Sequence, residues 1–174
     1  MKGIIIYKSK YGATRQYAEW IGKELDIPVF ESDALDSDQL NQSDYVILGS
    51  SVYIGKLLIR KWLNKNSSSI LGKRTYLFVV CGTPANKKDQ LNSYITESVP
   101  EKIRHRYKIY FLPGRLILNR LSWVDSILLK MGAWMAKSRE AKKEMVKEYD
   151  EVSKENIREL VNAVKRTSMA KPGS

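Results

Sequence analysis

The chain has one cysteine and one histidine among its 174 residues, and it contains no long hydrophobic run. The single cysteine, Cys81, excludes an intrachain disulfide and is typical of a reducing compartment. No stretch reaches the roughly 18 uncharged apolar residues that a membrane-spanning helix needs. The apolar run after Met1-Lys2 is too short for the core of a signal peptide. We therefore expect a cytoplasmic protein, either soluble or peripheral on the inner face of the cell membrane.

Acidic residues are scarce in the middle of the chain. The formal net charge is +11, but residues 1–50 carry a net charge of −3, residues 51–100 carry +6 and residues 101–147 carry +8. Such a concentration of positive charge favours an anionic partner, either lipid headgroups, nucleic acid or an acidic substrate. A solvated face that aids solubility is the alternative. No RNA- or DNA-binding motif accompanies the charge, so we expect no nucleic-acid partner.

Apolar runs alternate along the chain with stretches in which apolar residues recur at helical spacing. The apolar runs predict strands at 2–7, 29–30, 45–51, 74–84 and 107–112. The stretches with helical spacing predict helices at 14–25, 37–42, 54–66, 89–98 and 153–166. Strands with intervening helices predict a parallel sheet with helices on both faces. We expect a single α/β domain over residues 1–174, a three-layer sandwich whose five-stranded parallel sheet has the order 2-1-3-4-5.

Finer predictions concern residues within these elements. Ser37 is expected to cap the short second helix. Leu58 and Trp62 are expected to face the core from the third helix, and the polar stretch 65–69 is expected to be a loop. An apolar stripe in the last helix predicts four inward-facing residues, namely Ile157, Leu160, Val161 and Val164.

The stretch from about 113 to 150 does not fit this alternation. A normal connection between the fifth strand and the last helix would take only a few residues, so we interpret the stretch as a helical insertion with its own function. Apolar residues at helical spacing predict an amphipathic helix with a broad apolar face, made of Leu121, Trp123, Val124, Ile127, Leu128, Met131, Trp134 and Met135. Asp125 and Lys130 interrupt this face.

Basic residues flank the predicted helix of the insertion. They are Arg115, Arg120, Lys137, Arg139, Lys142 and Lys143. An apolar face with indole rings and flanking cations favours an anionic membrane surface, which residues 115–143 would contact. Packing on the chain's own domain, or a homodimer interface, is the alternative use of the same helix.

The sequence SKYGAT (9–14) lies directly between the first strand and the first helix. Gly12 permits a tight turn in which backbone N–H groups line a concavity, and Ser9 and Thr14 add hydroxyl groups. With the helix N-terminus that follows, this loop suits a phosphate. It is neither a Walker loop nor a G-x-G-x-x-G dinucleotide fingerprint. A helix that is simply capped by Thr14 is the alternative interpretation.

Two further loops end at the same edge of the predicted sheet. In GSSVYIGK (49–56), small residues allow a planar ligand to approach the backbone, and Tyr53 offers a stacking surface. In CGTPANK (81–87), Gly82 and Thr83 offer backbone and hydroxyl groups. The alternatives are a core or surface tyrosine and an ordinary turn. We interpret Cys81 as a small buried hydrophobe, because nothing nearby in the sequence argues for an activated thiolate.

The SKYGAT loop resembles the phosphate loop of the FMN-binding flavodoxin family. VILGSSVYIGKL and the basic, aromatic insertion GRLILNRLSWVDSILLKMGAWMAK are similar to those of the menaquinone-dependent protoporphyrinogen oxidases, which have flavodoxin-like folds. The CGTPANK loop departs from the aromatic or acidic third loop of many flavodoxins. The resemblance implies no catalytic side chain and no metal. It implies FMN binding by Ser9, Lys10, Tyr11, Gly12, Ala13, Thr14, Ser50, Ser51, Val52, Tyr53, Ile54, Gly55, Cys81, Gly82 and Thr83.

The function that this resemblance implies is an FMN-dependent oxidoreductase that passes electrons to a quinone at the membrane surface. Its electron donor would be a porphyrinogen-like or another reduced small molecule. The three loops contain no carboxylate. Four lysines lie in or beside them, namely Lys10, Lys56, Lys87 and Lys88. Positive charge stabilises reduced flavin, which favours a higher potential than that of an acidic shuttle. An electron-transfer flavodoxin and a non-enzymatic flavin-binding module are the alternatives.

Overall fold

Five parallel strands form the centre of the molecule in the computed structural model, which describes residues 1–135 and 147–169. They are β1 (Gly3–Lys8), β2 (Val29–Glu31), β3 (Tyr45–Tyr53), β5 (Arg74–Cys81) and β6 (Tyr107–Pro113). Their order in the sheet is β2-β1-β3-β5-β6, and all four pairings between them are parallel. This arrangement confirms the predicted order of 2-1-3-4-5.

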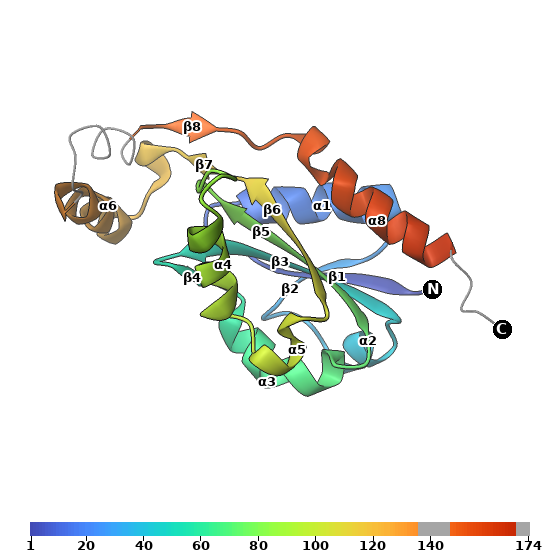
Figure 1. Ribbon diagram of the computed structural model, residues 1–174. Helices are drawn as coiled ribbons and strands as arrows, with labels where there is room; N and C mark the ends of the chain where they lie inside the picture. The colour runs from blue at the N-terminus through green and yellow to red at the C-terminus, as the bar shows by residue number, and fades with distance from the viewer. Residues whose placement is uncertain (136–146, 170–174) are drawn as a thin grey trace.

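Helices cover both faces of the sheet (Figure 1). One face carries α1 (Ala13–Leu25) and α8 (Arg158–Met169), and the other carries α2 (Ser37–Asn41), α3 (Arg60–Ile70), α4 (Lys88–Thr96) and α5 (Glu101–Arg104). Successive side chains of a strand point to opposite faces, so Ile4 and Ile6 join one core while Ile5 joins the other. Burial on both faces explains why the central strands are continuous apolar runs.

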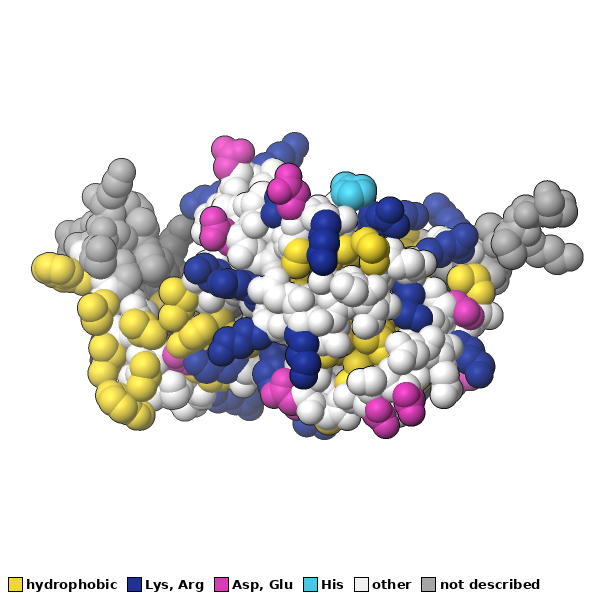
Figure 2. Space-filling view, turned by 90° about the horizontal axis from the view of Figure 1, so that it is seen from below, with side chains coloured by type: hydrophobic (Ala, Val, Ile, Leu, Met, Phe, Trp, Pro, Cys, Tyr) yellow, Lys and Arg dark blue, Asp and Glu magenta, His cyan; other side chains and the backbone are white. Residues whose placement is uncertain are grey.

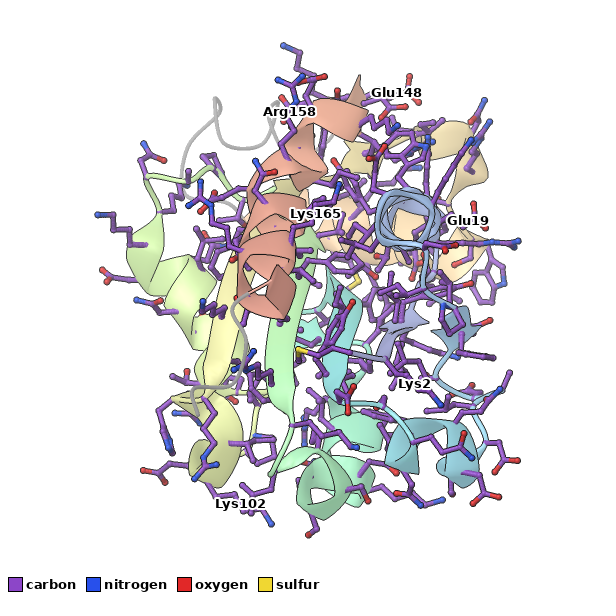
Figure 3. All side chains as sticks on the ribbon, turned by 90° about the vertical axis from the view of Figure 1, so that its right-hand side faces the viewer. Lys2, Glu19, Lys102, Glu148, Arg158 and Lys165 are labelled. Atoms are coloured by element: carbon purple, nitrogen blue, oxygen red, sulfur yellow. The ribbon has the colours of Figure 1, made fainter. Side chains whose placement is uncertain are left out.

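The last helix forms as predicted, with its apolar stripe against the sheet. It starts as a 3-10 helix, η2 (Lys154–Ile157), and continues as α8. Ile157, Leu160, Val161 and Val164 are all buried. Arg158 and Lys165, which are labelled in Figure 3, are exposed charged residues of the same helical segment. The predicted inward face is therefore confirmed.

The third helix differs from its prediction. Residues 54–59 form a turn and the short strand β4 (Lys56–Leu57), which pairs antiparallel with the end of β3, and α3 begins only at Arg60. Ile54 and Gly55 both have positive φ, at 49° and 72°, a geometry typical of tight hairpins. Leu58 therefore precedes the helix, although Trp62 does pack against the core. The stretch 65–69 is not a loop, because α3 continues to Ile70.

The cap of α2 also differs from its prediction. Asp36, not Ser37, precedes the helix in extended conformation, and its carboxylate accepts a hydrogen bond from the N–H of Asp38 at 3.2 Å. The Gln39 side chain accepts a hydrogen bond from the N–H of Asp36, which completes a capping box. A carboxylate at this position also interacts favourably with the positive end of the helix dipole.

Gly49 of β3 allows a close approach between two central strands. The ring of Phe78, from the neighbouring strand β5, lies where a β-carbon at position 49 would stand. Phe78 is completely buried. A glycine is therefore required here by packing rather than by backbone conformation, since its φ is not positive.

A helical insertion follows β6, as predicted. It leaves the sandwich through β7 (Arg115–Leu116) and η1 (Leu118–Arg120), forms α6 (Trp123–Met135), and returns through β8 (Tyr149–Asp150). At its base β7 and β8 form an antiparallel pair, in which Leu116 is opposite Tyr149. Figure 1 shows α6 beside the carboxyl ends of the strands. Within residues 1–135 and 147–169, no helix is long and apolar enough to cross a membrane.

Candidate functional site

A cavity of about 430 Å³ lies at the carboxyl ends of the parallel strands, next to the insertion. The three predicted loops line it with Ser9, Lys10, Tyr11, Ala13, Thr14, Ser51, Val52, Tyr53, Ile54, Cys81 and Gly82. The insertion lines it with Gly114, Arg115, Leu116, Ile117, Arg120, Leu121, Asp125, Leu128, Leu129 and Tyr149. The structure thus brings together most of the predicted residues and adds a wall that we did not predict from the sequence.

Four of the predicted residues support the loops without lining the cavity. The N–H of Gly12 donates to the hydroxyl of Ser9 at 3.1 Å, and the buried Ser50 hydroxyl accepts from the N–H of Ile59 at 3.2 Å. The Thr83 hydroxyl lies 2.8 Å from that of Tyr94. Gly55 occupies the turn between β3 and β4. That any of the fifteen predicted residues binds a ligand stays a prediction.

The first loop contains a buried hydroxyl group, that of Thr14, which has no hydrogen-bond partner in the described part of the chain. Gly12 has φ 85° and is the residue that caps α1, which has no side-chain cap and no acidic residue in its first turn. Thr14 is therefore not the cap. Its side chain is completely buried, and its Oγ1 has no hydrogen-bond partner in the part of the chain that the structure describes. Ser51 also lines the cavity, and its Oγ is likewise buried without a hydrogen-bond partner among the described residues.

These unused donors fit a phosphate group. A buried hydroxyl without a partner costs free energy, and an anion in the cavity would supply the missing acceptor. The N-terminus of α1 adds free N–H groups and a partial positive charge at the same place. The residues of the first loop therefore fit the phosphate of a cofactor, as the sequence predicts.

Asp125, from α6, is an acidic residue of the cavity wall that sequence reasoning missed. We predicted it only as an interruption of an apolar face, but its side chain is 7% exposed and lies in the cavity wall. Its carboxylate accepts hydrogen bonds from the hydroxyls of Tyr53, at 2.6 Å, and of Tyr11. It also pairs with the ammonium of Lys10, at 2.7 Å. A single acidic residue within an apolar helical stripe was the sequence signal.

Lys10 is held between this carboxylate and an aromatic ring. Its ammonium lies 3.7 Å from the centroid of the Tyr53 ring, within the range of a cation–π interaction. Burial lowers the pKa of Lys10, but the hydrogen bonds to Asp125 and Tyr53 outweigh it, so the pKa is raised above its ordinary value. Lys10 is therefore charged at neutral pH. Lys56, Lys87 and Lys88 do not line the cavity.

A hydrogen bond joins the start of α6 to the first loop. The N–H of Ser122 donates to the hydroxyl of Tyr11 at 3.3 Å, and the Ser122 hydroxyl accepts from the N–H of Asp125 at 3.2 Å. The hydroxyl caps the first turn of α6 while the backbone contacts the loop. The position of α6 is therefore tied to the residues expected to hold a phosphate.

The third loop meets the returning strand of the insertion. Gly82 lies against the hydroxyl of Tyr149, where a β-carbon would collide with it. Burial raises the pKa of the neighbouring Cys81 thiol. The thiol is therefore protonated at neutral pH, as expected without an activated thiolate, although Cys81 is half-buried and not buried as predicted.

Known proteins with the same architecture agree with this description. The sequence profile of a flavodoxin domain family matches residues 4–143. An uncharacterized protein of Methanocaldococcus jannaschii is 32% identical over 132 residues, which cover 68% of this chain and 87% of the relative.

Solved structures show the same fold. Oxidised flavodoxin 2 from Bacillus cereus has a TM-score of 0.50 at 21% identity and covers 65% of this chain and 84% of its own. A protein from Streptococcus mutans has a TM-score of 0.51 at 9% identity and covers 83% of this chain and 98% of its own. From its sheet order, its loops and these matches, the chain belongs to the flavodoxin domain family.

Proposed function

We propose that this chain binds FMN non-covalently in the cavity and works as a flavin-dependent oxidoreductase. The observation that carries this proposal is the buried, unpartnered hydroxyl of Thr14 at the N-terminus of α1. Thr14, Ser9 and the backbone N–H groups of the loop would hold the phosphate. Ser51, Tyr53 and Gly82 would flank the ring. When bound, FMN supplies the electron-accepting ring system, and the protein supplies position and environment.

The wall from the insertion suggests the kind of substrate. Leu116, Ile117 and Leu121 present apolar surface to the cavity, and Arg120 adds a cation at its edge. An apolar reductant that carries carboxylates would match both, as would a quinone that accepts the electrons. We therefore propose the quinone-linked oxidation of a porphyrinogen, similar to menaquinone-dependent protoporphyrinogen IX dehydrogenase. The chain's own residues would exclude water and orient the two reactants against the flavin.

An anaerobic assay tests this proposal. Protein loaded with FMN is mixed with protoporphyrinogen IX and menaquinone, and porphyrin fluorescence is followed. We expect fluorescence to rise only when both FMN and the quinone are present. FMN uptake without turnover would contradict the oxidase activity and favour an electron-transfer flavodoxin, and absence of FMN uptake would overturn both.

We also propose that α6 contacts an anionic membrane surface at the cytoplasmic side. Its exposed apolar residues are Trp123, Val124, Ile127, Leu128, Met131 and Trp134. The yellow surface at the end of the molecule in Figure 2 belongs to this helix, and Ile54, which is 69% exposed, lies in the neighbouring hairpin at the same end of the sheet. The predicted cations Lys137, Arg139, Lys142 and Lys143 lie outside the described residues. A lipophilic quinone would reach the cavity from such a surface.

Removing both exposed indoles of α6 should abolish membrane binding. Trp123 and Trp134 are 76% and 79% exposed, so the Trp123→Ser/Trp134→Ser variant should lose interfacial burial without losing core packing. We expect the parent protein to sediment with anionic vesicles at low salt. The double variant should stay in the supernatant and still bind FMN.

The matched control is Leu71→Ser, which removes another exposed apolar side chain far from α6 in the chain and should leave sedimentation unchanged. High salt should weaken binding, since each basic residue near the surface contributes about 1 kcal/mol that ions screen. If the parent protein does not sediment at all, α6 is a protein-contacting element, such as a homodimer interface.

A further inference from the structure

We propose that Asp125 is a positioning residue, which the insertion supplies to the cofactor site, and that it cancels the charge of Lys10 beside the bound flavin. The inference rests on the proposed FMN binding. It concerns the reduction potential of the flavin and not the identity of the substrate. Nothing in the sequence of the three loops indicates it, because the loops themselves contain no carboxylate.

Donors from two separate loops meet on one carboxylate, since Lys10 and Tyr11 follow β1 while Tyr53 ends β3. All three donors line the cavity together with Asp125. A carboxylate with three donors from two chain segments fixes those segments relative to each other. Asp125 therefore sets where the ring of Tyr53, the residue expected to flank the flavin, can lie.

The charges of Asp125 and Lys10 compensate each other. The side chain of Asp125 is 7% exposed, and that of Lys10 is 34% exposed. Removing charges from water is tolerated when they are paired and hydrogen-bonded, as both are here. As a pair they present almost no net charge to the cavity. The basic loop that the sequence suggests is therefore close to neutral on the side that faces a bound ring.

Reduction adds negative charge to the flavin, which a nearby cation stabilises and a nearby anion destabilises. While both members of the pair are present, their effects oppose each other. Neutralising Asp125 leaves the charge of Lys10 unopposed, and neutralising Lys10 leaves that of Asp125 unopposed. The two substitutions must therefore shift the potential in opposite directions.

A double-mutant cycle tests this inference with Asp125→Asn, Lys10→Met and the double variant. Asparagine removes the charge and keeps one of the two oxygens that accept from the tyrosine hydroxyls. FMN binding is measured first, by quenching of flavin fluorescence, and the reduction potential of the bound flavin is then measured by anaerobic titration with reference dyes. We expect Asp125→Asn to shift the potential to more positive values and Lys10→Met to more negative values. The double variant should lie between them, near the parent protein.

The control is Asp38→Asn, an exposed aspartate of α2 that does not line the cavity and should leave the potential unchanged. Shifts of the same sign in both single variants, or no shift in either, overturn the inference while FMN binding stands. If the parent protein takes up no FMN, the proposed function and the inference both fail. If Asp125→Asn does not fold, Lys10→Met decides alone, since a positive or absent shift contradicts the pair.

Discussion

Thr14→Val should lower the affinity for FMN by about 10- to 150-fold, because it removes a charge-assisted hydrogen bond of about 1.5–3 kcal/mol to the phosphate. Valine has nearly the same shape as threonine, so the buried site next to Gly12 stays filled. In the part of the chain that the structure describes, the Thr14 hydroxyl has no hydrogen-bond partner that the substitution would remove. We therefore expect the apoprotein to be at least as stable as the parent, so that the loss is specific to binding.

Fluorescence titration of the apoprotein with FMN measures this effect, and urea unfolding measures the stability. The matched control is Thr75→Val, which removes another buried threonine hydroxyl. This hydroxyl does not line the cavity, and it donates a hydrogen bond of 3.2 Å to the carbonyl of Lys73. It should leave the FMN affinity unchanged. An unchanged affinity for Thr14→Val would contradict the phosphate cradle. A loss of apoprotein stability would instead indicate a structural role for the hydroxyl.

Gly49→Ala should destabilise the fold by about 1–3 kcal/mol, the usual cost of an extra methyl group in a packed core. The ring of Phe78 occupies the position of the new β-carbon and is completely buried. It can move only by displacing its neighbours in the core between the sheet, α1 and α8. The midpoint of urea unfolding, monitored by circular dichroism, should fall accordingly.

Phe78→Leu in the same chain gives the internal check on this second prediction. Leucine is smaller and makes room for the new methyl group, so the double variant should lose less stability than the sum of the two single variants. Gly72→Ala is the control, because a β-carbon there meets no atom within 4 Å. It should change stability by no more than about 0.5 kcal/mol. Strict additivity of Gly49→Ala and Phe78→Leu would mean that the two positions do not share a contact.

The sheet and the position of the cavity could be predicted because they follow from local patterns. Strands buried on both faces appear as uninterrupted apolar runs, as in residues 3–8 and 74–81. Parallel strands place their following loops at one edge. The residues of those loops therefore come together once the strand order is right, and most of them do line one cavity.

What could not be predicted depends on contacts between distant segments. The hairpin after β3 places Ile54 at positive φ, a conformation that β-branched residues rarely adopt, so the local pattern favoured a helix there. Ser67 is buried inside α3 although serines are typical of loops. Asp125 shows the same limit at the site, because its three partners are far from it in sequence.

The pairing of β7 with β8 closes the insertion at its base, so the length of the insertion does not affect the geometry of the sheet. Leu116 and Tyr149 are held opposite each other at the base of the insertion, so the chain leaves the sandwich and returns to it at one fixed place. The entropy of closing such a loop grows slowly, by about 0.6 kcal/mol for each doubling of length. Segments of different length and composition could therefore be exchanged there during evolution without rebuilding the sheet. Since this stretch forms one wall of the cavity, a different segment at this place would change which reactants the cavity can hold.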